Sequence, residues 1–119
     1  MKLIIAYIQP YMLKKVQEAL RKAKIHGMSV MDVRGFGQQK DPSFLYYNSE
    51  LALEFVPKVK IEIFCPDNQE NEIVQTIFEN AKTGRIGDGK IFVLPVLRAK
   101  RIRTGEEGEA VIKYDVQAK

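Results

Sequence analysis

Residue types that build cross-links and metal centres are scarce in this chain. Its 119 residues include a single cysteine, Cys65, and a single histidine, His26. One cysteine cannot form a disulfide within the chain, and no Cys/His cluster indicates a metal centre. No pair of nucleophile and general base is apparent either. We therefore expect Cys65 to be a core thiol, His26 to lie exposed in a turn, and the protein not to be an enzyme.

Long apolar runs are also missing. No run approaches the roughly 20 residues that a membrane-spanning helix requires. The N-terminus lacks the charged, apolar and cleavage regions of a signal peptide. The sequence therefore predicts a cytoplasmic protein without direct membrane insertion. Its 119 residues, 45% hydrophobic and 29% charged, suit one globular domain with a modest core.

Positive charge is in slight excess, with a formal net charge of +4. Much of the excess lies at four positions near the C-terminal end: Arg98, Lys100, Arg101 and Arg103. A basic cluster attracts nucleic acid, and it attracts other phosphorylated ligands as well. An excess of this size does not distinguish the two.

The chain divides into two similar halves, each with the pattern strand, helix, strand. Apolar runs predict strands at residues 2–9, 28–36, 58–65 and 90–97. After Pro10, apolar residues at helical spacing predict a helix whose inward face consists of Leu13, Val16, Leu20 and Ala23. After Pro66, a second helix turns inward Ile73, Val74, Ile77, Phe78 and Ala81. Gly27 and Gly84 are expected to end the two helical connections.

Two strand–helix–strand units fused in this way predict an α+β fold, the ferredoxin-like double βαβ sandwich with both helices on one face. The strands read as apolar on both faces, since Leu3, Ile4 and Ile5 are consecutive and residues 91–94 are Ile-Phe-Val-Leu. Such runs indicate burial on both sides. Because two helices cover only one face of the sheet, we expect the other face to be covered by self-association.

The most informative run is glycine-rich and lies at residues 83–92, with Gly84, Gly87 and Gly89 followed by Lys90. Glycines let backbone N–H groups surround an anion, and a lysine adds a charge, so the run suits phosphate. The letters match the start of a P-loop. However, Ile91 replaces the magnesium-holding Ser or Thr, and a strand rather than a helix follows. We therefore expect a phosphate site of another design; a plain helix-to-strand turn is the alternative.

A long connection, residues 38–55, separates the two halves. Connections of more than about 12–15 residues are unusual in a compact domain and are often functional. This one contains several large apolar side chains: Phe44, Leu45, Tyr46, Tyr47 and Leu51. It is typical of an element that binds a partner. A hairpin packed on its own domain remains the alternative.

Residues suited to one phosphorylated ligand flank the last predicted strand, with Lys90 before it and Arg101 and Arg103 after it. A strand of about 8 residues spans about 26 Å. One copy of the chain would therefore hold the two groups at opposite ends of that strand. Both groups can contact one ligand only if a neighbouring subunit supplies the second.

Four segments, in this order and spacing, resemble the motifs of the PII signal-transduction family, small trimeric regulators of nitrogen metabolism. They are Gly35-Phe-Gly-Gln-Gln-Lys40, Pro57-Lys-Val-Lys60, Thr83-Gly-Arg-Ile-Gly-Asp-Gly-Lys-Ile-Phe92 and Arg101-Ile-Arg-Thr-Gly-Glu106. The resemblance covers residues 1–112 and leaves 113–119 as a tail. It implies a T-loop at about 37–55, a B-loop at about 82–90 and a C-loop at about 101–109.

The resemblance also implies a homotrimer with ATP or ADP in three clefts between subunits. The residues that would hold the phosphates are Gly87, Asp88, Gly89 and Lys90, joined by Arg101 and Arg103 of the neighbour. The residues that would hold adenine and ribose are Gly27, Met28, Ser29 and Glu62. From the base of the T-loop, Gly35, Gly37 and Gln38 would approach the nucleotide.

In relatives that sense 2-oxoglutarate, a magnesium ion bridges the ATP phosphates, the side chain at Gln39 and the 2-oxoglutarate, whose carboxylate pairs with Lys58. Magnesium prefers such oxygen ligands. This sequence departs from the family at Asp41, which replaces a glycine, and at Pro42. Both residues restrict a backbone that would wrap the ligand. The sequence therefore leaves 2-oxoglutarate binding open.

The T-loop departs from the family too. Leu51 occupies the position of the tyrosine that many relatives uridylylate, so that switch is expected to be absent. Ser49 matches a position phosphorylated in some relatives, but Tyr47 and Asn48 replace the Arg-Gly that usually precedes it. The expected partner is a target protein, such as a transporter or an enzyme of nitrogen metabolism.

Two alternative functions remain. In an RNA-binding domain of the same fold, residues 34–37 would correspond to the motif RNP1 and residues 90–93 to RNP2, but their order here is reversed. A slow nucleotide-hydrolysing enzyme is the second alternative. We expect no nucleic-acid partner.

Overall fold

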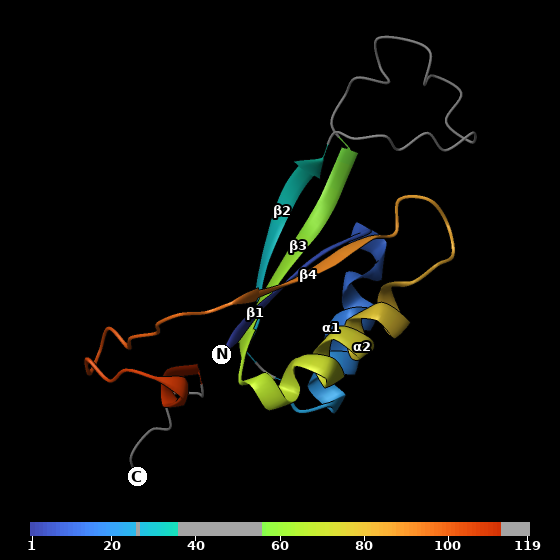
Figure 1. Ribbon diagram of the computed structural model, residues 1–119. Helices are drawn as coiled ribbons and strands as arrows, with labels where there is room; N and C mark the ends of the chain where they lie inside the picture. The colour runs from blue at the N-terminus through green and yellow to red at the C-terminus, as the bar shows by residue number, and fades with distance from the viewer. Residues whose placement is uncertain (26, 36–55, 113–119) are drawn as a thin grey trace.

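The protein forms an antiparallel four-stranded sheet with two helices packed on one face (Figure 1). The computed structural model describes residues 1–25, 27–35 and 56–112. In chain order the helices and strands are β1 (Lys2–Ile8), η1 (Pro10–Met12), α1 (Leu13–Lys22), β2 (Ser29–Gly35), β3 (Val56–Cys65), η3 (Asp67–Gln69), α2 (Glu70–Ala81), β4 (Gly89–Pro95) and η4 (Glu109–Ile112).

The strand order in the sheet is β2-β3-β1-β4, and each neighbouring pair is antiparallel. Strands β1 and β2 are therefore parallel to each other with β3 between them, and β3 and β4 are parallel with β1 between them. Helix α1 connects the first pair, and α2 connects the second (Figure 1). This is the split βαβ arrangement, so the predicted ferredoxin-like α+β fold is confirmed.

The core lies between the sheet and the helices. Every second residue of β1 is buried there, and the same alternation continues in β3; the buried strand residues are Ile4, Ala6, Ile8, Val59, Ile61, Ile63 and Cys65. The helices contribute Val16, Leu20, Ile73, Ile77 and Ala81. Burying each large aliphatic side chain stabilises the fold by about 1.5–3 kcal/mol. The prediction that Cys65 is a core thiol is confirmed.

The opposite face of the sheet carries apolar side chains that remain partly exposed. On this face Phe64 is 50% exposed, Phe92 48% and Leu94 41%. Tyr7 packs edge-on against Phe92, with ring centroids 6.4 Å apart. The prediction that the strands are apolar on both faces is confirmed for β1 and β4.

Helix α1 ends differently from the prediction. It stops at Lys22, and the residue that adopts the left-handed conformation after it is Lys24, with φ 63°, rather than Gly27. The N–H of Ile25 donates to the carbonyl of Leu20, and the N–H of Lys24 to that of Arg21. These bonds form a Schellman motif, which satisfies carbonyls at the helix end and offsets the cost of positive φ at a lysine.

Helix α2 also ends before its predicted glycine. Its last residue is Ala81, and Lys82 is already extended. Gly84 lies in the following loop with φ +86°. Ile73, Ile77 and Ala81 share the buried face as predicted, but Phe78 is 48% exposed. It follows Ile77 directly, and one helical step of about 100° turns it away from the core.

Strand ends follow from pairing partners. Residue 97 is not part of β4, because β4 stops at Pro95, opposite Lys2, where β1 begins. Strand β3 starts two residues earlier than predicted, at Val56, because it pairs there with Gly35 of β2. Among the described residues, no helix is long and apolar enough to cross a membrane.

Candidate functional site

The predicted site residues that the structure describes fall into two groups at opposite ends of the sheet. One group, the loop-end cluster, lies where β1 and β2 end and where β3 and β4 begin; it consists of Gly35, Lys58, Gly87, Asp88, Gly89 and Lys90. The other group, the pocket-end cluster, lies where β2 begins; it consists of Gly27, Met28, Ser29 and Glu62.

Lys58 is the central cation of the loop-end cluster. It lies near the start of β3 and is only 5% exposed. Its Nζ donates to the carbonyl oxygen of Gly87 at 2.5 Å. Burial lowers the pKa of the Lys58 ammonium, and the negative charge of Asp88 partly opposes that shift. An anion entering this end of the sheet would stabilise the charged ammonium further.

A second donor reaches the same carbonyl, and sequence reasoning missed it. The side chain of Gln9, at the end of β1, donates from Nε2 to the Gly87 oxygen at 2.8 Å. The two residues are 78 positions apart in the chain. No local pattern marks this contact, because it depends on how the loop returns to the sheet.

The loop between α2 and β4, residues 82–88, is organised from within by Asp88. The Asp88 carboxylate accepts from the backbone N–H of Thr83 at 2.8 Å, from that of Gly84 at 2.9 Å and from the Thr83 hydroxyl. Burial raises the pKa of Asp88, but these hydrogen bonds outweigh it and leave that pKa below its usual value. The Asp88 side chain thus organises the loop, and the role of residue 88 beside the phosphates stays a prediction.

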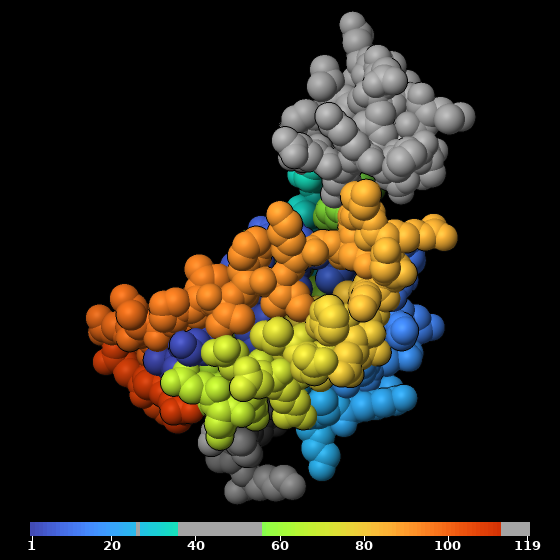
Figure 2. All heavy atoms as spheres, turned by 45° about the vertical axis from the view of Figure 1, so that its right-hand side comes forward, coloured from blue at the N-terminus to red at the C-terminus, as the bar shows by residue number. Residues whose placement is uncertain are grey.

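Gly89 marks the point where the loop joins β4. Its φ is +108°, and an added Cβ would lie 1.6 Å from the backbone oxygen of Tyr7 on the neighbouring strand. No side chain fits there. Lys90 follows at once, exposed at the start of β4. The glycine therefore lets the loop come close against β1 and present Lys90 beside it (Figure 2 shows the loop in gold next to the green start of β3).

The pocket-end cluster lines an open cavity of about 800 Å³. Ser29 and Glu62 are paired across β2 and β3, and both lie in its wall with Gly27 and Met28. The Glu62 carboxylate is held by Lys60, whose Nζ is 3.1 Å away. Apolar walls with a few polar groups are typical of small-molecule sites.

The segment after β4 closes this cavity on one side through Arg98, Ala99 and Lys100. Arg101 comes next and is tied into the segment, since it pairs with Glu106 at 3.0 Å and donates to the carbonyl of Ala110. Arg103 is exposed.

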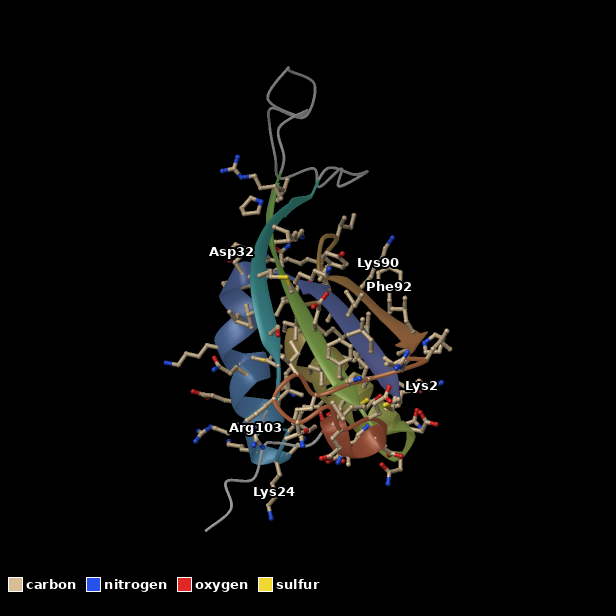
Figure 3. The ribbon with its side chains drawn as sticks, turned by 90° about the vertical axis from the view of Figure 1, so that its left-hand side faces the viewer. Lys2, Lys24, Asp32, Lys90, Phe92 and Arg103 are labelled. Atoms are coloured by element: carbon tan, nitrogen blue, oxygen red, sulfur yellow. The ribbon has the colours of Figure 1, made fainter. Side chains whose placement is uncertain are left out.

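The two clusters lie well apart within a single chain. Lys58 and Glu62 are four residues apart along β3, a separation of about 13 Å. Figure 3 shows Lys90 and Arg103 well apart, with Lys90 at the upper right and Arg103 at the lower left. The loop-end cluster offers two cations and a glycine-rich backbone for an anion. The pocket-end cluster offers a cavity whose wall carries the Glu62 carboxylate and, from the segment after β4, the side chains of Arg98 and Lys100.

Several predicted site residues lie outside the described part of the chain. They are Gly37, Gln38, Gln39 and Ser49, together with Asp41, Leu51 and His26. The magnesium prediction depends on Gln39. Among residues 1–25, 27–35 and 56–112, no group of three or more His, Cys, Asp or Glu could hold a metal ion.

The chain is similar to known proteins along nearly its whole length. A family model described as nitrogen regulatory protein P-II matches residues 1–106. The nitrogen regulatory protein P-II 1 of Escherichia coli K12 is 53% identical over 112 residues, which cover 94% of this chain and 100% of the relative. The nitrogen regulatory protein P-II of Haemophilus influenzae is 50% identical over the same shares of both chains.

The fold has a solved counterpart as well. A crystal structure of Arabidopsis thaliana PII bound to citrate superposes with a TM-score of 0.75 at 42% sequence identity, covering 92% of this chain and 90% of that one. Sequence and fold therefore agree, and the chain belongs to the P-II family of nitrogen-regulatory signal-transduction proteins.

Proposed function

We propose that the protein is a homotrimeric sensor that binds ATP or ADP in clefts between subunits. In each cleft the loop-end cluster of one subunit holds the phosphates, and the pocket-end cluster of the next holds adenine and ribose, with Arg101 and Arg103 adding charge. The T-loop, residues 37–55, then regulates a target protein, a transporter or an enzyme of nitrogen metabolism. Ligands that favour one loop state shift its population by their differential affinity.

The observation that supports this proposal most strongly is the division of the site. Each cluster is chemically incomplete, and the two lie at opposite ends of the same sheet. A cleft between two copies would combine a cationic, glycine-rich loop with a cavity that carries a carboxylate. The exposed apolar face that includes Phe64, Phe92 and Leu94 supports assembly, because large exposed apolar patches mark interaction sites.

Mixed trimers test the division directly. Lys90→Glu disables the loop-end cluster, and Arg103→Glu disables the pocket-end side. Each variant alone is expected to lose ATP binding by calorimetry, because a carboxylate replaces a cation beside the phosphates. Co-refolding the two variants together creates clefts with both intact halves, so binding should return in part. A site within one subunit would give no such recovery.

Ligand titrations test the remaining parts. Calorimetry with ATP, ADP, and 2-oxoglutarate with magnesium should show nucleotide binding, and it decides whether 2-oxoglutarate is a co-ligand despite Asp41 and Pro42. No binding of either nucleotide would overturn the proposal. RNA binding that ATP does not compete away, or a turnover number of about 1 per second or more, would favour the alternative functions instead.

A further inference from the structure

One carbonyl oxygen connects the glycine-rich loop to the sheet. The Gly87 oxygen accepts from Gln9 Nε2 at 2.8 Å and from Lys58 Nζ at 2.5 Å. A carbonyl oxygen has two lone pairs, so it can satisfy both donors at once. The packing is tight: an added Cβ at Gly87 would lie 3.0 Å from the Gln9 nitrogen and 3.6 Å from the Lys58 nitrogen.

The two donors differ in how they respond to an anion. Lys58 is charged and partly desolvated, so a phosphate or carboxylate that reaches it competes directly with the Gly87 carbonyl. Gln9 is neutral, so an anion competes less strongly for its N–H than for the Lys58 ammonium. When Lys58 turns toward a ligand, Gln9 is the donor that keeps the carbonyl in place. Asp88 cannot substitute for it, because its hydrogen bonds to Thr83 and Gly84 lie within the loop.

We propose that Gln9 is a positioning residue for the phosphate-binding loop. It holds the Gly87 carbonyl at the end of β1, so that Lys58 can pair with a ligand anion without releasing residues 82–88 from the sheet. The inference rests on the proposed nucleotide-binding function for its consequence, but the Gln9–Gly87 contact lies within one chain and can be tested without nucleotide.

The first test measures the loop without any ligand. Gln9→Leu removes the donor at similar size, and Gln17→Leu, on the exposed side of α1, is the matched control. Hydrogen exchange of the amides of residues 83–88 is expected to become about 3- to 10-fold faster in Gln9→Leu, as expected for the net loss of one hydrogen bond. Gln9→His keeps an N–H donor at a similar reach and should restore slow exchange, which a purely space-filling role would not predict.

The second test measures binding. Gln9→Leu should weaken ATP and ADP by about 3- to 10-fold in calorimetric titration, while Gln17→Leu binds like the wild type. In the exchange experiment, the double variant Lys58→Met with Gln9→Leu should exchange faster than the product of the two single effects, because each single variant still has one donor to the shared carbonyl and the double variant has none.

The outcomes of these experiments distinguish the proposed nucleotide-binding function from the positioning role of Gln9. If the wild-type protein binds no nucleotide, the proposed function fails, whereas faster loop exchange in Gln9→Leu would still support the Gln9 contact. If the wild type binds ATP and Gln9→Leu binds it equally well, Gln9 does not position the loop. Unchanged exchange in Gln9→Leu, or no recovery in Gln9→His, also overturns the inference.

Discussion

Gly89 occupies a backbone position that no other residue can adopt without distortion. Its φ is +108°, and a Cβ there would lie 1.6 Å from the Tyr7 carbonyl oxygen. We predict that Gly89→Ala loses more than about 3 kcal/mol of unfolding free energy or fails to fold, because strain and a backbone clash combine. Urea unfolding measures the loss.

Two other glycines provide a graded comparison. Gly84 has φ +86° but open space around its Cβ position, so Gly84→Ala should cost about 1–2 kcal/mol. Gly27 has open space and no positive φ, so Gly27→Ala should stay within about 0.5 kcal/mol of the wild type. A Gly89→Ala protein as stable as Gly84→Ala would contradict the argument.

Lys58 and Lys60 lie two residues apart on β3 and should respond to alkaline pH in opposite ways. Burial lowers the pKa of Lys58, whereas the hydrogen bond to Glu62 raises that of Lys60. Between the lowered pKa of Lys58 in the folded chain and the ordinary lysine pKa of about 10.4, the unfolded chain keeps a proton on this side chain that the folded chain has released. The contribution of Lys58 to the free energy of unfolding therefore rises as the pH increases through the lowered pKa of Lys58.

The sign is reversed for Lys60. Its contribution is fully present below the ordinary lysine pKa and is lost as pH rises through the raised one. We predict that the stability of the wild type relative to Lys58→Met increases between neutral pH and pH of about 10, while the stability relative to Lys60→Met does not. Unfolding curves at fixed protein concentration measure both differences. A decreasing difference for Lys58→Met would contradict its burial-driven shift.

At the scale of one element, the loop at 82–88 is held in shape by a single carboxylate. Asp88 accepts from two backbone N–H groups and one hydroxyl, so Asp88→Ala leaves three donors without their partner. We predict a loss of about 1–2 kcal/mol, which allows for partial solvent access. Asp88→Asn should lose less, because the amide oxygen still accepts and the amide nitrogen can donate to the Thr83 hydroxyl.

Acid titration adds an independent check on Asp88. Its folded pKa is lowered, so its contribution to stability is present above the ordinary value of about 3.9 and is lost as pH falls through the lowered one. The stability of the wild type relative to Asp88→Asn should shrink over that range. At Thr83, substitution by Ser should preserve the loop and substitution by Val should not. Equal stability of the two Thr83 variants would contradict the hydrogen-bond argument.

Elements were predictable where their signal is local. The apolar run of β1 and the spacing of Ile73 and Ile77 in α2 lie within one segment each, so the sequence alone indicates the strands, the helices and the buried faces of the helices. The fold class then follows from the order of the elements.

Features that depend on distant contacts were not predictable. The Gln9–Gly87 bond joins residues 78 positions apart. Lys24, rather than Gly27, ends α1, because hydrogen bonds at the helix end decide which residue adopts positive φ. Lys58 is buried because the returning loop covers it, and its contact with Gly87 joins residues 29 positions apart. In the candidate site, the sequence indicates which residue types are present. The role of each residue follows only from its contacts in the folded chain.

At the scale of the whole molecule, exposed apolar side chains on the sheet and on the helices lie in different surroundings. Phe92 on the open sheet face and Phe78 on α2 are each 48% exposed. Phe92 belongs to a continuous apolar face with Tyr7, Leu94 and Phe64. Phe78 has the Lys82 ammonium 5.3 Å from its ring centre. The two residues therefore form a matched pair for locating the subunit interface.

We predict that Phe92→Asp dissociates the proposed trimer into single chains, because a charge placed in an apolar interface is desolvated without a partner. Phe78→Asp, with the same change at the same exposure, should remain trimeric. Light scattering during gel filtration measures both masses, and the dissociated Phe92→Asp chain should also lose ATP binding, since each cleft needs two subunits. A trimeric Phe92→Asp protein, or a monomeric Phe78→Asp protein, would place the interface elsewhere. A wild type that is monomeric at micromolar concentration would remove the assembly on which the shared site depends.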